Sequence, residues 1–135
     1  MGSDAMNIPC LMDTNVLICF LNGYPDALFR ERTLAAFSQA SAVSVVTVIE
    51  LLGWRKHTEQ SRWSARGLLE CLDELPLERR VVATTIELRS RHAIRLGDAI
   101  IAATALTHGL PLMTRNIDDF RNVDGLPLIN PFEVA

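Results

Sequence analysis

The chain has 135 residues, of which 49% are hydrophobic and 21% are charged, and its formal net charge is −3. These values are ordinary for a globular protein with one full hydrophobic core. The negative charge argues against a protein that coats nucleic acid through bulk electrostatics. No apolar run reaches the roughly 20 residues of a membrane span. Residues 1–5 (Met-Gly-Ser-Asp-Ala) are typical of an expression scar, so we expect a single domain over residues 6–135.

Two features of residue usage bear on environment and partners. Cys10, Cys19 and Cys71 are scattered among apolar residues, which favours buried thiols in a cytoplasmic protein over a disulfide or zinc framework. Lys56 is the only lysine, so nearly every basic residue is an arginine. Because arginine is common at protein interfaces and its planar fork matches phosphate, we expect surface or partner roles for most of them.

Apolar runs and turn residues alternate along the chain. The predicted strands cover residues 8–12, 42–46, 75–77, 110–114 and 127–129. The predicted helices cover residues 15–21, 27–39 (with Asp26 as its cap), 47–59, 62–72, 79–92 and 97–108. Strands that alternate with helices build parallel βαβ units. We therefore expect an α/β fold of three layers, in which helices flank a central, mostly parallel sheet.

Asp13 interrupts an apolar run that begins at Ile8 and resumes at Val16. A carboxylate is costly to bury unless a cation or several hydrogen-bond donors accompany it. This acid directly follows a predicted strand, so it lies at the carboxyl end of the strand, where open α/β sheets bind ligands. We interpret Asp13 as the first of several acids that hold a divalent metal.

Two further acids lie near the starts of predicted helices. Glu50 is in the first turn of the predicted helix 47–59, where Thr47 and Glu50 would form a capping box, but the same position also points toward Asp13. Asp98 is near the start of the predicted helix 97–108, where an acid is favoured as a cap and by the helix dipole. The sequence leaves helix capping and metal binding open for both acids.

A further group of polar and acidic residues, 114–119 (Thr-Arg-Asn-Ile-Asp-Asp), follows the predicted strand 110–114. Asp118 and Asp119 are adjacent, so both cannot easily serve one site. We expect Asp119, beside Phe120, to face inward and Asp118 to be solvated. The alternative is a polar turn held by hydrogen bonds from side chains to the backbone.

All of these acids are predicted to share one edge of the sheet: Asp13, Glu50, Asp98 and the cluster at residues 114–119. Carboxylates that converge raise one another's pKa values unless a cation lies among them. Ligand sets made only of oxygen favour hard cations such as Mg²⁺ or Mn²⁺ over zinc. The sequence therefore predicts an acidic metal site at this edge.

These segments, in this order, resemble the PIN-domain nucleases, and more narrowly the VapC-type toxins of prokaryotic toxin–antitoxin pairs. The resemblance extends from about Cys10 to Phe132. It rests on residues 12–18 (Met-Asp-Thr-Asn-Val-Leu-Ile), 47–51 (Thr-Val-Ile-Glu-Leu), 98–105 (Asp-Ala-Ile-Ile-Ala-Ala-Thr-Ala) and 109–120 (Gly-Leu-Pro-Leu-Met-Thr-Arg-Asn-Ile-Asp-Asp-Phe). The resemblance implies a PIN fold and Mg²⁺- or Mn²⁺-dependent hydrolysis of RNA by a metal-activated water. It also implies a homodimer, a cognate VapB-like antitoxin and a cytoplasmic location.

The resemblance also assigns roles to residues of this chain. It makes Asp13, Glu50 and Asp98 the metal ligands, and we expect these three and Asp119 to be the catalytic acids. The family often has an aspartate where this chain has Asn116, so either Asn116 or Asp119 completes the acidic site. The residues expected to orient the ligands or the scissile phosphate are Thr14, Asn15, Thr114 and Asn116.

Two other functions are alternatives to the nuclease. A catalytically degenerate PIN domain would act as an RNA- or protein-binding module, and Asn116 is the one sequence feature that favours it. A phosphatase or phospho-acceptor domain with Asp13 as nucleophile fits poorly. The haloacid-dehalogenase pattern has a second aspartate where this chain has Asn15, and the lysine that such domains use late in the chain is absent.

Overall fold

A computed structural model describes residues 8–132. The expected expression scar at residues 1–5 and both ends of the expected domain lie outside the described residues. Within them, five strands and seven helices form an α/β structure. No helix of this part of the chain combines the length and the apolar character needed to traverse a bilayer.

The five strands form one parallel sheet. In chain order they are β1 (Leu11–Met12), β2 (Ala42–Ser44), β3 (Asp73–Leu75), β4 (Leu112–Met113) and β5 (Leu128–Ile129). Their order in the sheet is β3-β2-β1-β4-β5, and all four strand pairings are parallel. The predicted parallel α/β architecture is therefore confirmed, and β1 occupies the centre of the sheet.

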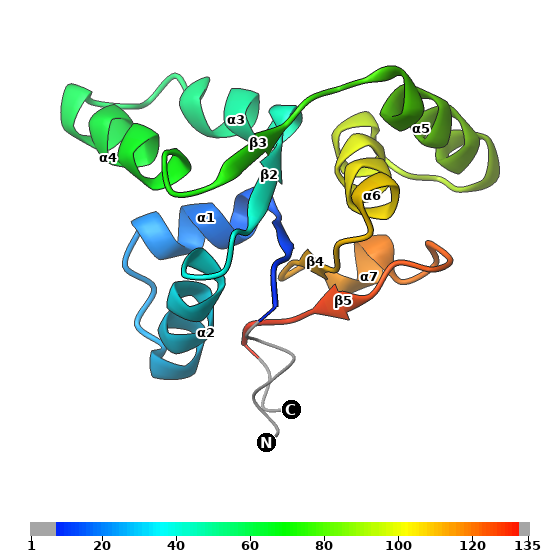
Figure 1. Cartoon of the computed structure of the whole chain (residues 1–135). Helices are drawn as coiled ribbons and strands as arrows, with labels where there is room; N and C mark the ends of the chain where they lie inside the picture. Colours follow the sequence, from blue (N-terminus) through cyan, green and yellow to red (C-terminus); the bar gives the residue numbers. More distant parts are fainter. Residues whose placement is uncertain (1–7, 133–135) are drawn as a thin grey trace.

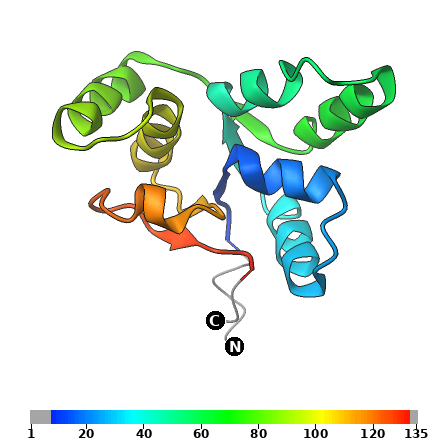
Figure 2. The ribbon, with the colours of Figure 1, turned by 180° about the vertical axis from the view of Figure 1, so that it is seen from behind.

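The helices cover both faces of the sheet (Figures 1 and 2). The helices α1 (Thr14–Leu21), α2 (Ala27–Phe37), α3 (Val45–Leu52) and α4 (Glu59–Leu69) lie on the left of the sheet in Figure 1. The helices α5 (Arg79–Arg91), α6 (Leu96–His108) and α7 (Ile117–Phe120) lie on the right. Three layers result, as the alternation of elements predicted.

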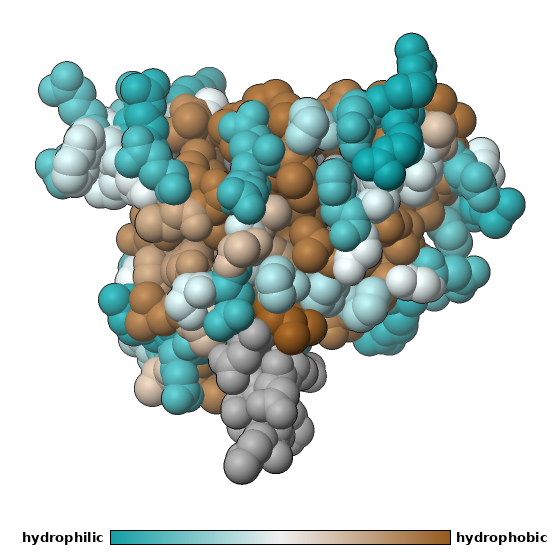
Figure 3. Space-filling model, viewed as in Figure 1, coloured by the Kyte–Doolittle hydropathy of each residue, from teal (hydrophilic) through white to brown (hydrophobic). Residues whose placement is uncertain are grey.

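Successive strand residues feed two separate hydrophobic cores, because side chains alternate between the faces of a sheet. Met12, Val43 and Met113 enter the core under α1–α4, where Phe29 is 1% exposed. Leu11, Ala42 and Leu112 enter the core under α5–α7. Apolar side chains also reach the surface between polar ones, as the brown areas of Figure 3 show. The carboxyl end of β1 therefore lies where the two cores meet.

The predicted boundaries were wrong around β2 and the two helices that follow it. The strand stops at Ser44, whose side chain accepts a hydrogen bond from Val46 N and caps α3. The helix therefore starts at Val45 instead of residue 47, and it ends at Leu52 instead of 59. The β-branched pair after Ser44 favours a strand by intrinsic propensity, but the serine cap overrides that preference here.

Other differences are smaller. Helix α4 covers Glu59–Leu69 instead of residues 62–72, and β3 covers Asp73–Leu75 instead of 75–77. Asp26 caps α2 as predicted, accepting a hydrogen bond from Phe29 N. The expectation of three buried thiols was confirmed for Cys10 and wrong for Cys19, which is half-buried, and for Cys71, which is exposed after α4.

Candidate active site

Asp13 is the buried centre of the site. It directly follows β1 and is also the N-cap of α1, so one carboxylate ends a strand and starts a helix. Oδ1 accepts a hydrogen bond from Thr14 N at 2.8 Å, and Oδ2 accepts one from the Thr114 hydroxyl at 2.8 Å. The side chain is 3% exposed. Two donors from separate strand ends therefore fix the orientation of the carboxylate.

The pKa of Asp13 depends on its burial and on the acids near it. Burial raises the pKa of Asp13 to about 6, although hydrogen bonds from Thr114 and Thr14 oppose the shift, and the charges of Asp98 and Glu50 raise the pKa further. Burial disfavours the charged form of an acid, and like charges add to that cost. At neutral pH the fold therefore brings several negative charges together around the Asp13 carboxylate.

Glu50 reaches the same place from the surface of α3. The Thr14 hydroxyl donates a hydrogen bond to Glu50 Oε1 at 2.7 Å and also lies 3.0 Å from Thr47 Oγ1. A methyl group at Gly97 would lie 3.5 Å from Glu50 Oε2, so this carboxylate lies against the start of α6. The capping-box interpretation of Thr47 and Glu50 was wrong, because Ser44 caps α3.

Thr47 is a residue that the sequence analysis did not assign to the site. It is fully buried and contacts Thr14, which orients Glu50. A polar β-branched residue in the apolar stretch 45–52 was the signal that would have found it.

Asp98 approaches from the first turn of α6. The N-cap of α6 is Arg95, whose side chain makes no capping hydrogen bond, so the alternative of Asp98 as the cap was wrong. Burial raises the pKa of Asp98, Asp119 and Glu50 raise it further, and Arg95 opposes the shift. Asp98 is thus electrostatically coupled to acids from α3 and α7.

The two adjacent acids of α7 differ in their surroundings. Asp118 forms an ion pair with Arg121, and its side chain is 84% exposed. Asp119 is also exposed, so the expectation that it faces inward was wrong, but its charge acts on Asp98. The segment is a short helix that begins after Asn116, so the polar-turn interpretation was incomplete. These observations single out Asp119 as the acid of this pair that adjoins the site.

The predicted orienting residues fall into two groups. Thr14 and Thr114 are buried and hydrogen-bond the acids directly, as described above. Asn116 contributes its backbone N–H, which donates to Thr114 Oγ1 at 3.0 Å. Asn15 is exposed. In the described part of the chain, neither asparagine side chain contacts the four acids through a hydrogen bond, so their orienting role stays a prediction.

The chemistry of the site suits a hard divalent cation. Within residues 8–132 no arginine, lysine or histidine forms an ion pair with Asp13, Glu50, Asp98 or Asp119. The donor set consists of carboxylate oxygens, which match Mg²⁺. No three acid, histidine or cysteine side chains of the described residues stand close enough to hold an ion directly. Because Mg²⁺ keeps several of its waters, a mixture of direct and water-mediated contacts fits this arrangement.

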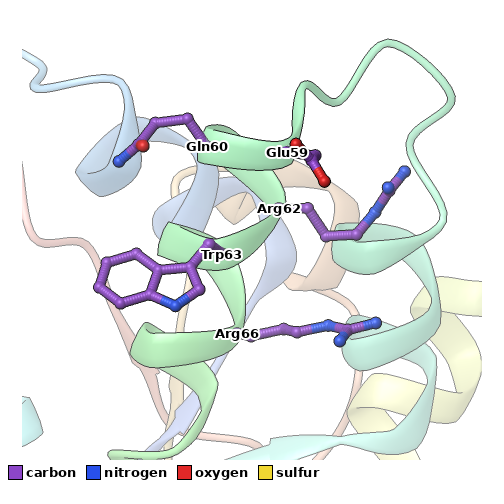
Figure 4. A pocket seen from close by; sticks show the side chains of 5 residues that line it. All are labelled: Glu59, Gln60, Arg62, Trp63 and Arg66. Atoms are coloured by element: carbon purple, nitrogen blue, oxygen red, sulfur yellow. The ribbon is translucent and has the colours of Figure 1, made fainter.

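Two surfaces lie beside α4. A groove of about 480 Å³ extends from Glu50 along the apolar side chains of Ile18, Leu21, Leu51 and Trp54. On the outer surface of α4, Trp63 extends from one side of the helix and is 74% exposed, whereas Arg62 and Arg66 extend from the opposite side of the helix (Figure 4). None of the four acids lines this outer surface, so it is separate from the site.

The fold and the site define a parallel α/β domain with an acid-lined edge at the carboxyl ends of its strands. A family model described as "PIN domain" matches residues 10–126, and the chain belongs to this family. The chain is 26% identical over 128 residues to ribonuclease VapC2 of Rickettsia felis, covering 89% of this chain and 96% of that protein. It is 27% identical over 129 residues to ribonuclease VapC1 of the same organism, covering 88% and 93%.

Solved structures give the same result. A toxin–antitoxin complex from Klebsiella pneumoniae matches with a TM-score of 0.74 at 30% identity and covers 93% of this chain and 99% of that chain. VapBC2 from Rickettsia felis, bound to a DNA fragment from its promoter, matches with a TM-score of 0.78 at 25% identity, covering 91% and 98%. The resemblance to PIN domains and to VapC proteins that the sequence suggested is confirmed.

Proposed function

We propose that the chain is a Mg²⁺- or Mn²⁺-dependent endoribonuclease, the toxin of a toxin–antitoxin pair. The observation that carries the proposal is the buried Asp13 carboxylate, oriented by Thr14 and Thr114, beside Asp98 and Glu50 with no cation paired to any of them in residues 8–132. A fold does not maintain such repulsion for its own stability. The distant VapC ribonucleases support RNA as the substrate.

Each residue has a distinct part in the proposed reaction. Asp13 and Asp98 would hold the metal directly, and Glu50 would hold it through water while the Thr14 hydroxyl fixes the position of Glu50. Thr114 keeps Asp13 turned toward the site. Asp119 adds negative charge beside Asp98 and completes the acidic site. When bound, Mg²⁺ supplies an activated water and stabilises the charge that develops on the scissile phosphate.

The test compares an aspartate of the site with an exposed aspartate that is next to Asp119 in the chain. Asp98→Asn should abolish Mn²⁺-dependent cleavage of RNA and growth inhibition, because it removes a ligand while it keeps the size of the side chain. Asp118→Asn is the matched control, since Asp118 is an exposed acid that pairs with Arg121. Circular dichroism should show that both variants are folded. Undiminished cleavage by a purified Asp98→Asn chain would refute the proposal.

We also propose a VapB-like antitoxin and a second copy of the chain as partners. The groove from Glu50 to Trp54 supports the first, because an apolar segment of a partner bound there would cover the entrance to the acids. Exposed Ile86 and Leu96 supply apolar surface for a homodimer contact. Toxin–antitoxin complexes among the solved relatives are consistent with the first partner.

The second candidate function is a catalytically degenerate binding module. It is favoured by the lack of a ready three-ligand cluster among the described residues and by Asn116 in place of an acid. Metal titration separates the two functions. Divalent binding that disappears in Asp13→Asn supports the nuclease, whereas RNA binding that is equal in chelator and in Mg²⁺, without cleavage, supports the module.

A further inference from the structure

Arg115 is a cation with an unusual set of contacts. Its guanidinium lies 4.9 Å from the ring centre of Phe132 and 5.4 Å from that of Tyr24. Within residues 8–132 its one hydrogen-bond contact is long, 3.7 Å from Nη1 to Cys19 Sγ. No carboxylate among residues 8–132 pairs with it, and the residue is exposed. A positive charge is therefore held at the surface by aromatic rings instead of by an acid.

The rings beneath Arg115 are anchored in the core. Phe132 packs edge to face against Tyr24 at 5.1 Å and stacks on Phe29 at 4.4 Å, and Phe29 is 1% exposed. Contacts between a guanidinium and aromatic faces restrict its orientation without neutralising its charge. The fold thus positions the guanidinium in advance and leaves its N–H donors available to an anion.

The position of Arg115 relates it to the acidic site. Its neighbour in the chain, Thr114, donates to Asp13 Oδ2. Arg115 also lines a hollow of about 470 Å³ together with Asn116, Asn130 and Asp119, and the charge of Asp119 acts on Asp98. The other arginine of this hollow, Arg121, is paired with Asp118. Arg115 is therefore the cation in the hollow that has no acidic partner within the described chain.

We infer that Arg115 binds a phosphate of the RNA next to the scissile one and so positions the strand across the acids. The inference rests on the proposed ribonuclease function and extends it with a substrate-binding residue. An arginine fork matches the oxygens of a phosphodiester group. A site built only of acids would repel an RNA backbone, and one prepositioned cation beside it offsets part of that repulsion.

The test measures RNA binding without cleavage. Asp98→Asn serves as the background, and the probe is a fluorescently labelled, mixed-sequence single-stranded RNA whose polarisation is followed at several KCl concentrations in Mg²⁺. In this background Arg115→Gln should lower the affinity roughly fivefold at ~0.1 M salt and reduce the salt slope by about 0.7, the value for one phosphate contact on a single strand. Arg115→Lys should keep the slope, because it keeps the charge.

Arg30 provides a matched control. Its guanidinium also lies over an aromatic ring, Phe20, at 5.1 Å, but it lines none of the hollow next to the acids. Arg30→Gln should leave both affinity and salt slope unchanged. Thermal unfolding of each variant separates a loss of structure from a loss of contact, because a structural role would lower stability without changing the slope.

Three results would overturn the inference. The first is an Arg115→Gln chain with unchanged affinity and slope. The second is an equal loss of affinity in Arg115→Gln and Arg115→Lys with no change in slope. The third is no RNA binding in the Asp98→Asn background. Cleavage by the unsubstituted chain, lost in Asp98→Asn, decides the proposed function separately, so the two failures are distinguishable.

Discussion

Asp13→Asn should stabilise the metal-free protein at neutral and basic pH while it removes activity. The folded-state pKa of Asp13 is about 6, compared with 3.8 for an ordinary aspartate. A raised pKa in an acid means that folding favours the protonated form. The cost of the charge is therefore absent below pH 3.8, grows as the pH rises, and is complete above pH 6.

The magnitude follows from the shift. A difference of about two pKa units corresponds to about 3 kcal/mol at ~pH 8, and to about 1 kcal/mol at ~pH 4.5. Asparagine has no charge to bury, so it escapes this cost. The side chain is almost fully buried, and solvent screening therefore does not reduce the figure much. The expected pH-dependent gain of Asp13→Asn over the parent is about 2 kcal/mol between these two pH values.

The assay is urea unfolding in EDTA, followed by circular dichroism at several pH values. The difference between the variant and the parent isolates Asp13 from the titrating groups that do not interact with it, and any constant change in hydrogen bonding cancels from its pH dependence. Adding Mg²⁺ should stabilise the parent more than the variant, because the metal binds the charged carboxylate. A difference that does not change with pH, or that falls as the pH rises, would refute the reasoning.

Two further substitutions test the hydrogen bond that orients Asp13 and the core under α1–α4. Thr114→Val removes the hydroxyl that donates to Asp13 Oδ2. Mn²⁺ affinity or single-turnover cleavage should therefore fall by about tenfold to a hundredfold, the usual effect of losing a group that orients a metal ligand. Parent-like values in both measurements would contradict this role. Phe29→Ala should lower the free energy of unfolding by about 3–5 kcal/mol in urea titrations, because the ring is fully buried and stacks on Phe132; a loss below about 1 kcal/mol would mean that this core collapses around the vacancy.

The candidate site could be located from the sequence because acids that are costly to bury stand out within apolar runs. Asp13 interrupts an apolar run, and Glu50 and Asp98 interrupt others. The rule that the carboxyl ends of parallel strands meet at one edge of the sheet then predicts that these acids lie together. The preference for Asp119 over Asp118 came from the neighbouring Phe120, which is buried and turns α7 toward the core. Metal binding by these acids stays a prediction.

What the sequence did not reveal depends on tertiary contacts. Val45 and Val46 have strong strand propensity, yet they begin a helix because Ser44 caps it and the chain must turn to cover the sheet. Thr47 looked like a cap and instead packs against Thr14 in the interior. The stacking of Arg115 on Tyr24 and Phe132 joins residues far apart in the chain, so no local pattern indicates it.

The shortness of the strands has a consequence for how the chain tolerates insertion. In β1 only Leu11 and Met12 pair with their neighbours, and each supplies a different core. One extra residue between Leu11 and Met12 would place these two side chains on the same face of the sheet and, with Leu11 kept in its register, would turn the carboxylate away from Thr114. The exposed connection at residues 53–56 has no such alternation and would absorb the same insertion. Length variation that leaves the acidic edge intact should therefore be confined to the connections, while the spacing of β1 to Asp13 stays invariant.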